Sequence, residues 1–129
     1  TDIGSFYELG FKNESMDIVF MSQAFHHADQ PLNLLNEINR ITRGGGVIIL
    51  SGENYISMYS QVKRIIKTLI KQGQFCTNFY ENFPPDDITG DHYYRLSDYY
   101  LFFQLLGYKV SHKIVDKTSV VLMAVKPDQ

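Results

Sequence analysis

The sequence is poor in cysteine, in excess charge and in long apolar runs. Its single cysteine, Cys76, excludes an internal disulfide framework and is typical of a reducing compartment, so we expect a cytoplasmic protein. Twelve basic against fourteen acidic residues leave a formal charge of −2, which gives the chain as a whole no electrostatic reason to bind nucleic acid. No apolar run reaches the length of a membrane span, so we predict no integral membrane segment.

The sequence does contain enough apolar material for a packed domain. Hydrophobic residues make up 44% and aromatic residues 14% of its 129 residues, which argues against a disordered chain. This length predicts one domain over residues 1–129. The first residue is Thr1 rather than methionine, so either the start was processed or the chain is an excerpt of a longer protein, and we expect the excerpt.

Two apolar runs on either side of an amphipathic segment predict a strand–helix–strand unit. The runs MDIVFMSQAF (16–25) and VIILSG (47–52) lack polar alternation, which is typical of parallel strands covered on both faces. Between them, Pro31 suits the first helical turn, Asp29 or Gln30 could cap it, and Gly44 could provide the left-handed stop. Helical spacing predicts one buried stripe of Leu34, Leu35, Ile38 and Ile41. This order predicts parallel pairing through a right-handed crossover.

The second half predicts two more helices, a long connection and a hairpin. The helix over residues 57–72 has an apolar face made of Met58, Val62, Ile65, Ile66 and Leu69. Residues 73–95, with glycines, prolines and many aromatics, form a long connection of the kind that often serves as a lid. Leu96 and Ser97 favour the start of a helix that ends at Gly107. Segments 108–116 and 119–126, joined by a short turn, predict an antiparallel hairpin.

Three motifs resemble those of the class I S-adenosylmethionine-dependent methyltransferases, in their small-molecule branch. ESMDIVFMSQAFHH is similar to the family's strand-four segment, NEINRITRGGGVIIL to the segment from helix to strand five, and LLGYKV to the entry of strand six. Glu37 and Arg40 match the family's E-x-x-R, whereas Gly44 replaces its usual proline. The resemblance implies an α/β, Rossmann-like half-domain, with parallel strands, helices and a C-terminal antiparallel hairpin.

The family's glycine-rich cofactor turn has no counterpart in these residues, since no G-x-G-x-G occurs. We therefore expect the C-terminal half of the fold, with weak cofactor binding by this chain alone. The resemblance implies methyl transfer from S-adenosylmethionine to a small-molecule or lipid-like acceptor. The alternative is a non-catalytic, methyltransferase-like interaction module that has lost the cofactor.

The resemblance also implies positions for the cofactor. Ligands of open α/β sheets lie outside the carboxyl ends of the strands. The residues that follow strand four would therefore flank the cofactor, although they could simply turn the chain: Ser22, Gln23, Ala24 and Phe25. Asp2, which precedes Leu9-Gly10-Phe11, resembles the family's adenine-binding aspartate.

Histidines supply the candidates for acid–base chemistry. His26 and His27 stand next to each other, and we expect one to be a structural hydrogen-bonder and the other a general base, because imidazole titrates near neutral pH. His92 is a further catalytic candidate. A metal site formed with Asp29 is not predicted, because adjacent histidines seldom point the same way and zinc-ligand spacings do not match.

The acceptor pocket is expected in the long connection. Tyr80, Tyr93 and Tyr94 would supply aromatic walls with polar tips, although they could equally form the core under a loop. The nearby acids Asp86, Asp87 and Asp91 are expected to be solvated.

Two surfaces could bind partners. The lysine row Lys63, Lys67 and Lys71 is more often a solvated face, although it could meet a membrane surface or RNA phosphates. Strand 16–21 would be an exposed sheet edge in a half-domain, so we expect either a homodimer through this edge or a missing N-terminal half.

Overall fold

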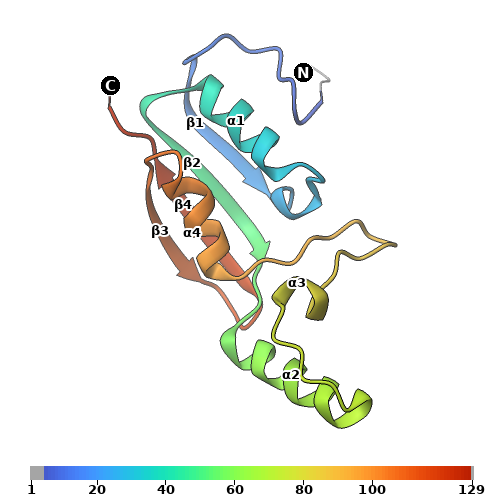
Figure 1. Ribbon diagram of the computed structural model, residues 1–129. Helices are drawn as coiled ribbons and strands as arrows, with labels where there is room; N and C mark the ends of the chain where they lie inside the picture. The colour runs from blue at the N-terminus through green and yellow to red at the C-terminus, as the bar shows by residue number, and fades with distance from the viewer. Residues whose placement is uncertain (1–4, 129) are drawn as a thin grey trace.

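The computed structural model describes residues 5–128 as an α/β fold built on one sheet (Figure 1). The strands are β1 (Met16–Ser22), β2 (Thr42–Asn54), β3 (Lys109–Ile114) and β4 (Ser119–Val125), and they lie in the order β1-β2-β4-β3. β1 and β2 pair in parallel, whereas β4 pairs antiparallel with both β2 and β3. The predicted parallel unit and the predicted C-terminal hairpin are both confirmed.

The core lies between one face of this sheet and two helices. α1 (Pro31–Ile41) and α4 (Leu96–Gln104) lie on the same face, while α2 (Met58–Gln72) and α3 (Phe79–Asn82) extend beyond its end (Figure 1). The largest fully buried side chains include Tyr99, Phe25, Phe103, Leu34, Leu35, Ile38, Ile48, Leu50 and Leu122. A 3-10 helix, η1 (Phe25–His27), places Phe25 among them directly after β1.

The opposite face of β1 is open in the described residues. Val19 and Met21 pack against the core, but Ile18 and Phe20, which alternate with them, are 63% and 62% exposed. The prediction that this strand is covered on both faces is therefore wrong for residues 5–128, because α1 and α4 share one face. The strand also ends at Ser22 rather than at residue 25.

The ends of α1 agree with one sequence expectation and correct another. α1 has Gln30 as its N-cap, and it stops at Ile41 because Thr42 turns to extended backbone and donates its Oγ1 hydrogen to the carbonyl of Ile38 (2.7 Å). Gly44 is not its left-handed stop, since it lies inside β2. The positive φ of 75° belongs to Gly45, in the irregular stretch of β2 where the register against β1 shifts.

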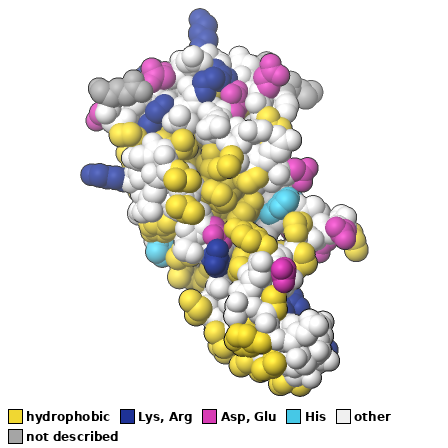
Figure 2. Space-filling view, in the orientation of Figure 1, with side chains coloured by type: hydrophobic (Ala, Val, Ile, Leu, Met, Phe, Trp, Pro, Cys, Tyr) yellow, Lys and Arg dark blue, Asp and Glu magenta, His cyan; other side chains and the backbone are white. Residues whose placement is uncertain are grey.

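The later helices lie where the sequence predicts them, but the apolar face of α2 is not buried. Ser57 caps α2 by accepting a hydrogen bond from the N–H of Ser60, and Gly73, at φ 65°, closes it. α4 is capped at Arg95, whose N–H donates to Asp98, and not at Ser97. No residue of α2 is buried in the described structure, so the predicted apolar face of this helix is not part of the core. Figure 2 shows hydrophobic side chains gathered at the end of the molecule that α2 forms.

A hydrogen-bonded turn joins the two strands of the C-terminal hairpin. Asp116 accepts hydrogen bonds from the N–H groups of Thr118 and Ser119 (both 2.9 Å), which fixes the turn between β3 and β4. These bonds lower the pKa of Asp116, and the bond from Thr118 has the largest effect.

Within residues 5–128, none of the helices combines the length and the apolar character that a membrane crossing requires.

Candidate functional site

The carboxyl ends of β1 and β2 meet at a tight turn. The N–H of Gln23 donates to the carbonyl of Ser51 (2.9 Å), so the chain leaves β1 while it is still attached to β2. Gln23 has a left-handed φ of 49°, and Gly52, at φ 66°, faces it. A Cβ added at Gly52 would lie 2.9 Å from Cγ of Gln23, so the glycine lets this side chain approach the backbone of β2.

Glu53 holds this turn in place. Its carboxylate accepts hydrogen bonds from the backbone N–H groups of Ala24 (3.2 Å), Phe25 (3.0 Å) and His26 (3.1 Å). The same carboxylate lies 2.8 Å from Nδ1 of His26, and Glu53 is 0% exposed. Glu53 is not among the site residues predicted from the sequence. The available signal was a single acid at the end of an apolar strand, where a buried charge requires several donors.

The two adjacent histidines point toward one acid. Their ring centroids are 4.3 Å apart. Oδ1 of Asp91 lies 3.0 Å from Nδ1 of His27 and 3.7 Å from Nε2 of His26. The expectations that the histidine rings diverge and that Asp91 is solvated are therefore wrong. A 3-10 helix brings both rings to the same side, and the long connection folds back onto them.

His92 ties the long connection to the same helix. Its N–H donates to the carbonyl of His26 (2.8 Å), and its Nε2 lies 3.3 Å from Oδ1 of exposed Asp29. The three candidate histidines are thus neighbours in space. His26 is buried against Glu53, while the side chain of His27 is 44% exposed and within reach of solvent.

The three candidate tyrosines do not line one site. Tyr94 is buried among Phe25, Tyr99 and Phe102, with ring centroids 5.4–6.0 Å apart. Burial raises the pKa of Tyr94 to about 12, so its hydroxyl stays protonated at neutral pH. Tyr80 is exposed.

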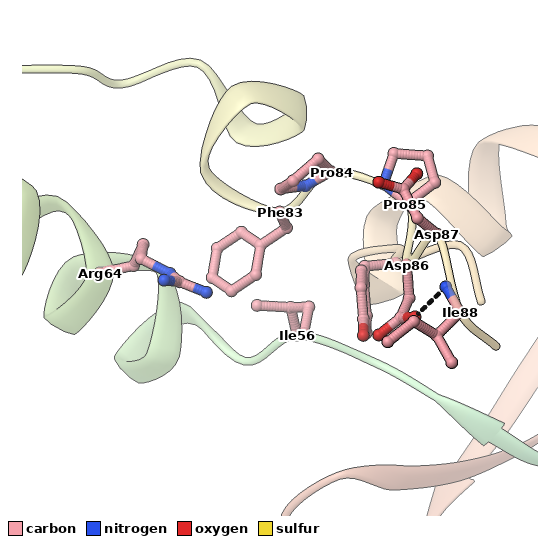
Figure 3. Close-up of a pocket in the computed structure, with 9 residues that line it drawn as sticks. Ile56, Arg64, Phe83, Pro84, Pro85, Asp86, Asp87 and Ile88 are labelled. Atoms are coloured by element: carbon pink, nitrogen blue, oxygen red, sulfur yellow. Dashed lines mark hydrogen bonds between the residues drawn. The ribbon is translucent and has the colours of Figure 1, made fainter. Parts of the chain in front are cut away.

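Tyr93 lines a cavity of about 600 Å³, between the start of α2 and residues 83–88 (Figure 3). Arg64 closes one side, with its guanidinium carbon 5.2 Å from the ring centroid of Phe83. On the other side, Asp86 accepts hydrogen bonds from the N–H groups of Ile88 (2.8 Å) and Thr89 (2.9 Å). These bonds lower the pKa of Asp86. The cavity therefore has apolar walls and three charged side chains, one basic (Arg64) and two acidic (Asp86 and Asp87).

The E-x-x-R pair has a structural explanation. Glu37 accepts from Arg40 and from the N–H of Leu9 (2.7 Å), and the Arg40 guanidinium also donates to the carbonyls of Leu9 (2.9 Å) and Phe11 (2.8 Å). The hydrogen bond from Arg40 is the main cause that lowers the pKa of Glu37 to about 2. The pair therefore clamps the segment before β1 onto α1.

Comparisons with known proteins agree with this architecture. Residues 2–50 match the family model described as "Methyltransferase domain". An uncharacterized methyltransferase of Schizosaccharomyces pombe is 29% identical over 82 residues, which cover 64% of this chain and 30% of that protein. Residues 2–50 and the overlapping part of the S. pombe protein are thus similar to methyltransferases in sequence. The motif resemblance is thereby confirmed.

Solved structures show the same fold at low sequence identity. A chain of the complex between the Haloferax volcanii Trm112 methyltransferase activator and a methyltransferase aligns with 96% of this chain (TM-score 0.63, 18% identity). A Thermotoga maritima protein, named as a possible histamine N-methyltransferase, aligns with 95% (TM-score 0.59, 19% identity). YcgJ of Bacillus subtilis aligns with 98% (TM-score 0.67, 11% identity). The chain spans 60%, 62% and 70% of these proteins, respectively.

The predicted cofactor residues do not all lie at the end of the strand. Ser22, Gln23 and Ala24 lie together at the carboxyl end of β1, whereas the ring of Phe25 is turned into the core. Asp2 lies outside the described residues, so its predicted adenine contact stays a prediction.

Proposed function

We propose that this chain forms the acceptor side of an S-adenosylmethionine-dependent methyltransferase, within its C-terminal half, and that the acceptor is a small molecule. The observation that carries the proposal is the turn at Ser22–Ala24, held at the carboxyl ends of two parallel strands by the buried Glu53. Ligands of open α/β sheets lie outside these strand ends.

The residues present fit one edge of the cofactor. Ser22 and Gln23 offer a hydroxyl and an amide at the rim of the sheet, and the fixed backbone keeps both in position. When bound, S-adenosylmethionine supplies an electrophilic methyl group for in-line displacement. Such a reaction needs alignment and exclusion of water more than strong acid–base groups.

A histidine at the strand end can take up the proton that the acceptor loses. His27 is half-exposed and lies beside Asp91 at 3.0 Å, an arrangement that suits a general base. His26 is less suited, because its Nδ1 is engaged by Glu53 at 2.8 Å. We assign His26 to positioning the turn and retain His27 and His92 as the candidates for proton transfer.

The cavity beside Tyr93 supports a small acceptor. Its volume of about 600 Å³ lies within the range of about 300–1,000 Å³ for small-molecule sites. The Thermotoga maritima relative in fold, a possible histamine N-methyltransferase, is named for an acceptor of this class. A lipid-like acceptor is the second option, because hydrophobic side chains gather on the nearby α2 (Figure 2).

A methyl-transfer assay tests the proposal. The full-length protein that contains this chain is incubated with S-adenosylmethionine labelled in the methyl group and with a set of small amines, carboxylates and phenols. We expect labelled product, and Gln23→Ala should weaken cofactor binding about tenfold. The matched control, Lys63→Ala with Lys67→Ala, should leave binding unchanged. Loss of binding in the control alone would move the function toward phosphate or membrane binding.

A non-catalytic interaction module is the weaker alternative. The family match and the S. pombe relative are both methyltransferases, which favours the enzyme. The module would fold normally and yet transfer no methyl group to any acceptor in the assay above. We further propose a cytoplasmic location, which the single cysteine supports, and self-association through β1.

A further inference from the structure

The cluster of His26, His27 and Asp91 has the composition of a metal site. One ligand atom from each residue lies within 4.8 Å of the other two. Two imidazoles and a carboxylate are the donor set of many sites for divalent transition metals. Two of the three distances, 3.0 and 3.7 Å, lie on either side of the value of about 3.3 Å expected between neighbouring ligands of a tetrahedral zinc ion.

Glu53 determines which nitrogen of His26 is free. Its carboxylate already accepts three backbone N–H bonds, so it acts as an acceptor toward Nδ1 of His26 as well, at 2.8 Å. His26 must then carry a proton on Nδ1, and in the neutral ring Nε2 offers a lone pair. This is the carboxylate–histidine arrangement that orients imidazole ligands toward metals.

The acid opposite that lone pair has an unsatisfied oxygen. Oδ1 of Asp91 is buried, and within the described part of the chain it has no hydrogen-bond partner, although two imidazole nitrogens lie nearby. Two acceptors, Nε2 of His26 and Oδ1 of Asp91, therefore face each other at 3.7 Å. A buried, unpaired acceptor is costly, and a cation between these atoms would remove the cost.

We propose that His26, His27 and Asp91 bind one divalent transition-metal ion of the Zn²⁺ type. His27 is half-exposed and Asp91 lies in a loop, so both side chains have room to adjust around the ion. The ion ties the long connection to the carboxyl end of β1, next to the proposed methyl-transfer site. While the ion is bound, His27 is a ligand, and His92 is the remaining candidate for proton transfer. Three protein ligands leave a coordination position open, as in sites where a zinc ion also binds water or substrate.

Titration of the metal-free protein tests this site. The purified chain is stripped with a chelator and titrated with Zn²⁺ by calorimetry and with Co²⁺ by visible absorption. We expect one equivalent to bind in the micromolar range, with the absorption bands of tetrahedral cobalt. Asp91→Asn and His27→Ala should each lower the affinity about tenfold or more. The controls are Asp87→Asn and His112→Ala, which should bind as the wild type does; His112 instead contacts Tyr100.

Thermal unfolding separates metal binding from misfolding. Zn²⁺ should raise the melting temperature of the wild-type chain and of both controls, and it should not raise that of Asp91→Asn, whose circular dichroism should match the wild type. Absence of Zn²⁺ and Co²⁺ binding by the folded wild-type chain would overturn the proposal. Equal binding by Asp91→Asn would overturn it too. Neither result would affect the proposed methyl transfer, which is assayed separately.

Discussion

Replacing Glu53 by glutamine is the sharpest test of how the turn after β1 is held. The introduced side chain would keep one carbonyl oxygen for the N–H groups of Ala24 and Phe25. Its amide group would replace the oxygen that lies 3.1 Å from the N–H and 2.8 Å from Nδ1 of His26. The ring can change tautomer and accept from the new amide, but the backbone N–H cannot. One buried donor therefore loses its acceptor.

The structure sets the size of the effect. The unpaired buried N–H costs about 1–3 kcal/mol, and the remaining bonds weaken because they are no longer charge-assisted. Together these losses amount to about 3 kcal/mol, since Glu53 is 0% exposed and water cannot replace the missing acceptor. For a chain of this length, that corresponds to a fall in melting temperature of about 10 °C.

Thermal unfolding followed by circular dichroism measures this change, and amide exchange locates it. The N–H of His26 should exchange faster in Glu53→Gln than in the wild type. Exposed Glu8 provides the matched control, because Glu8→Gln changes the same functional group outside the site. A melting temperature within about 2 °C of the wild type, or about 0.5 kcal/mol, would refute the assignment of Glu53 as the anchor of the turn.

Three further predictions concern the clamp, the cofactor and the sheet edge. The stability that Glu37 gains from Arg40 is fully present above pH 4.5 and is lost as the pH falls toward 2. The melting temperature of Glu37→Gln should therefore change less between these pH values than that of the wild type. Calorimetry of the chain alone should detect weak S-adenosylmethionine binding or none, because no glycine-rich turn occurs in these residues; micromolar affinity would contradict this. In sedimentation, the wild type should self-associate and Phe20→Lys should not. Leu105, which is 70% exposed against 62% for Phe20, lies away from β1, so Leu105→Lys should behave as the wild type. A concentration-independent wild-type monomer would rule out the edge contact.

Local patterns predicted the elements of this fold well, but not what covers them. The stripe of α1 is buried as expected, because β1 and β2 lie directly beneath it. The stripe of α2 has the same spacing, yet Met58 and Ile66 remain exposed. Helical periodicity identifies an apolar face, and only the three-dimensional arrangement decides whether another element packs on it.

In the candidate site, too, the sequence predicted some features and not others. The position of Ser22 and Gln23 at a strand end followed from the apolar run together with the family resemblance. The approach of Asp91 to His26 joins residues 65 positions apart, through a connection without a regular pattern. No spacing rule predicts such a contact, so the sequence suggested only Asp29, the acid nearest along the chain, for comparison with the histidines, and Asp91 was expected to be solvated.

Glu53 was not predicted, although the sequence contains part of the information needed to predict its role. Its burial could have been inferred, because a strand of apolar residues that is paired on both sides leaves little room for water at its end. A carboxylate there must find donors nearby, and the parallel neighbour supplies them whenever its chain turns at the same level. The acid on β2 and the left-handed Gln23 after β1 are thus two consequences of one requirement, since the turn must aim its N–H groups at Glu53. That requirement also fixes the free nitrogen of His26, so the backbone of the turn and the chemistry of the histidine pair depend on the same buried charge.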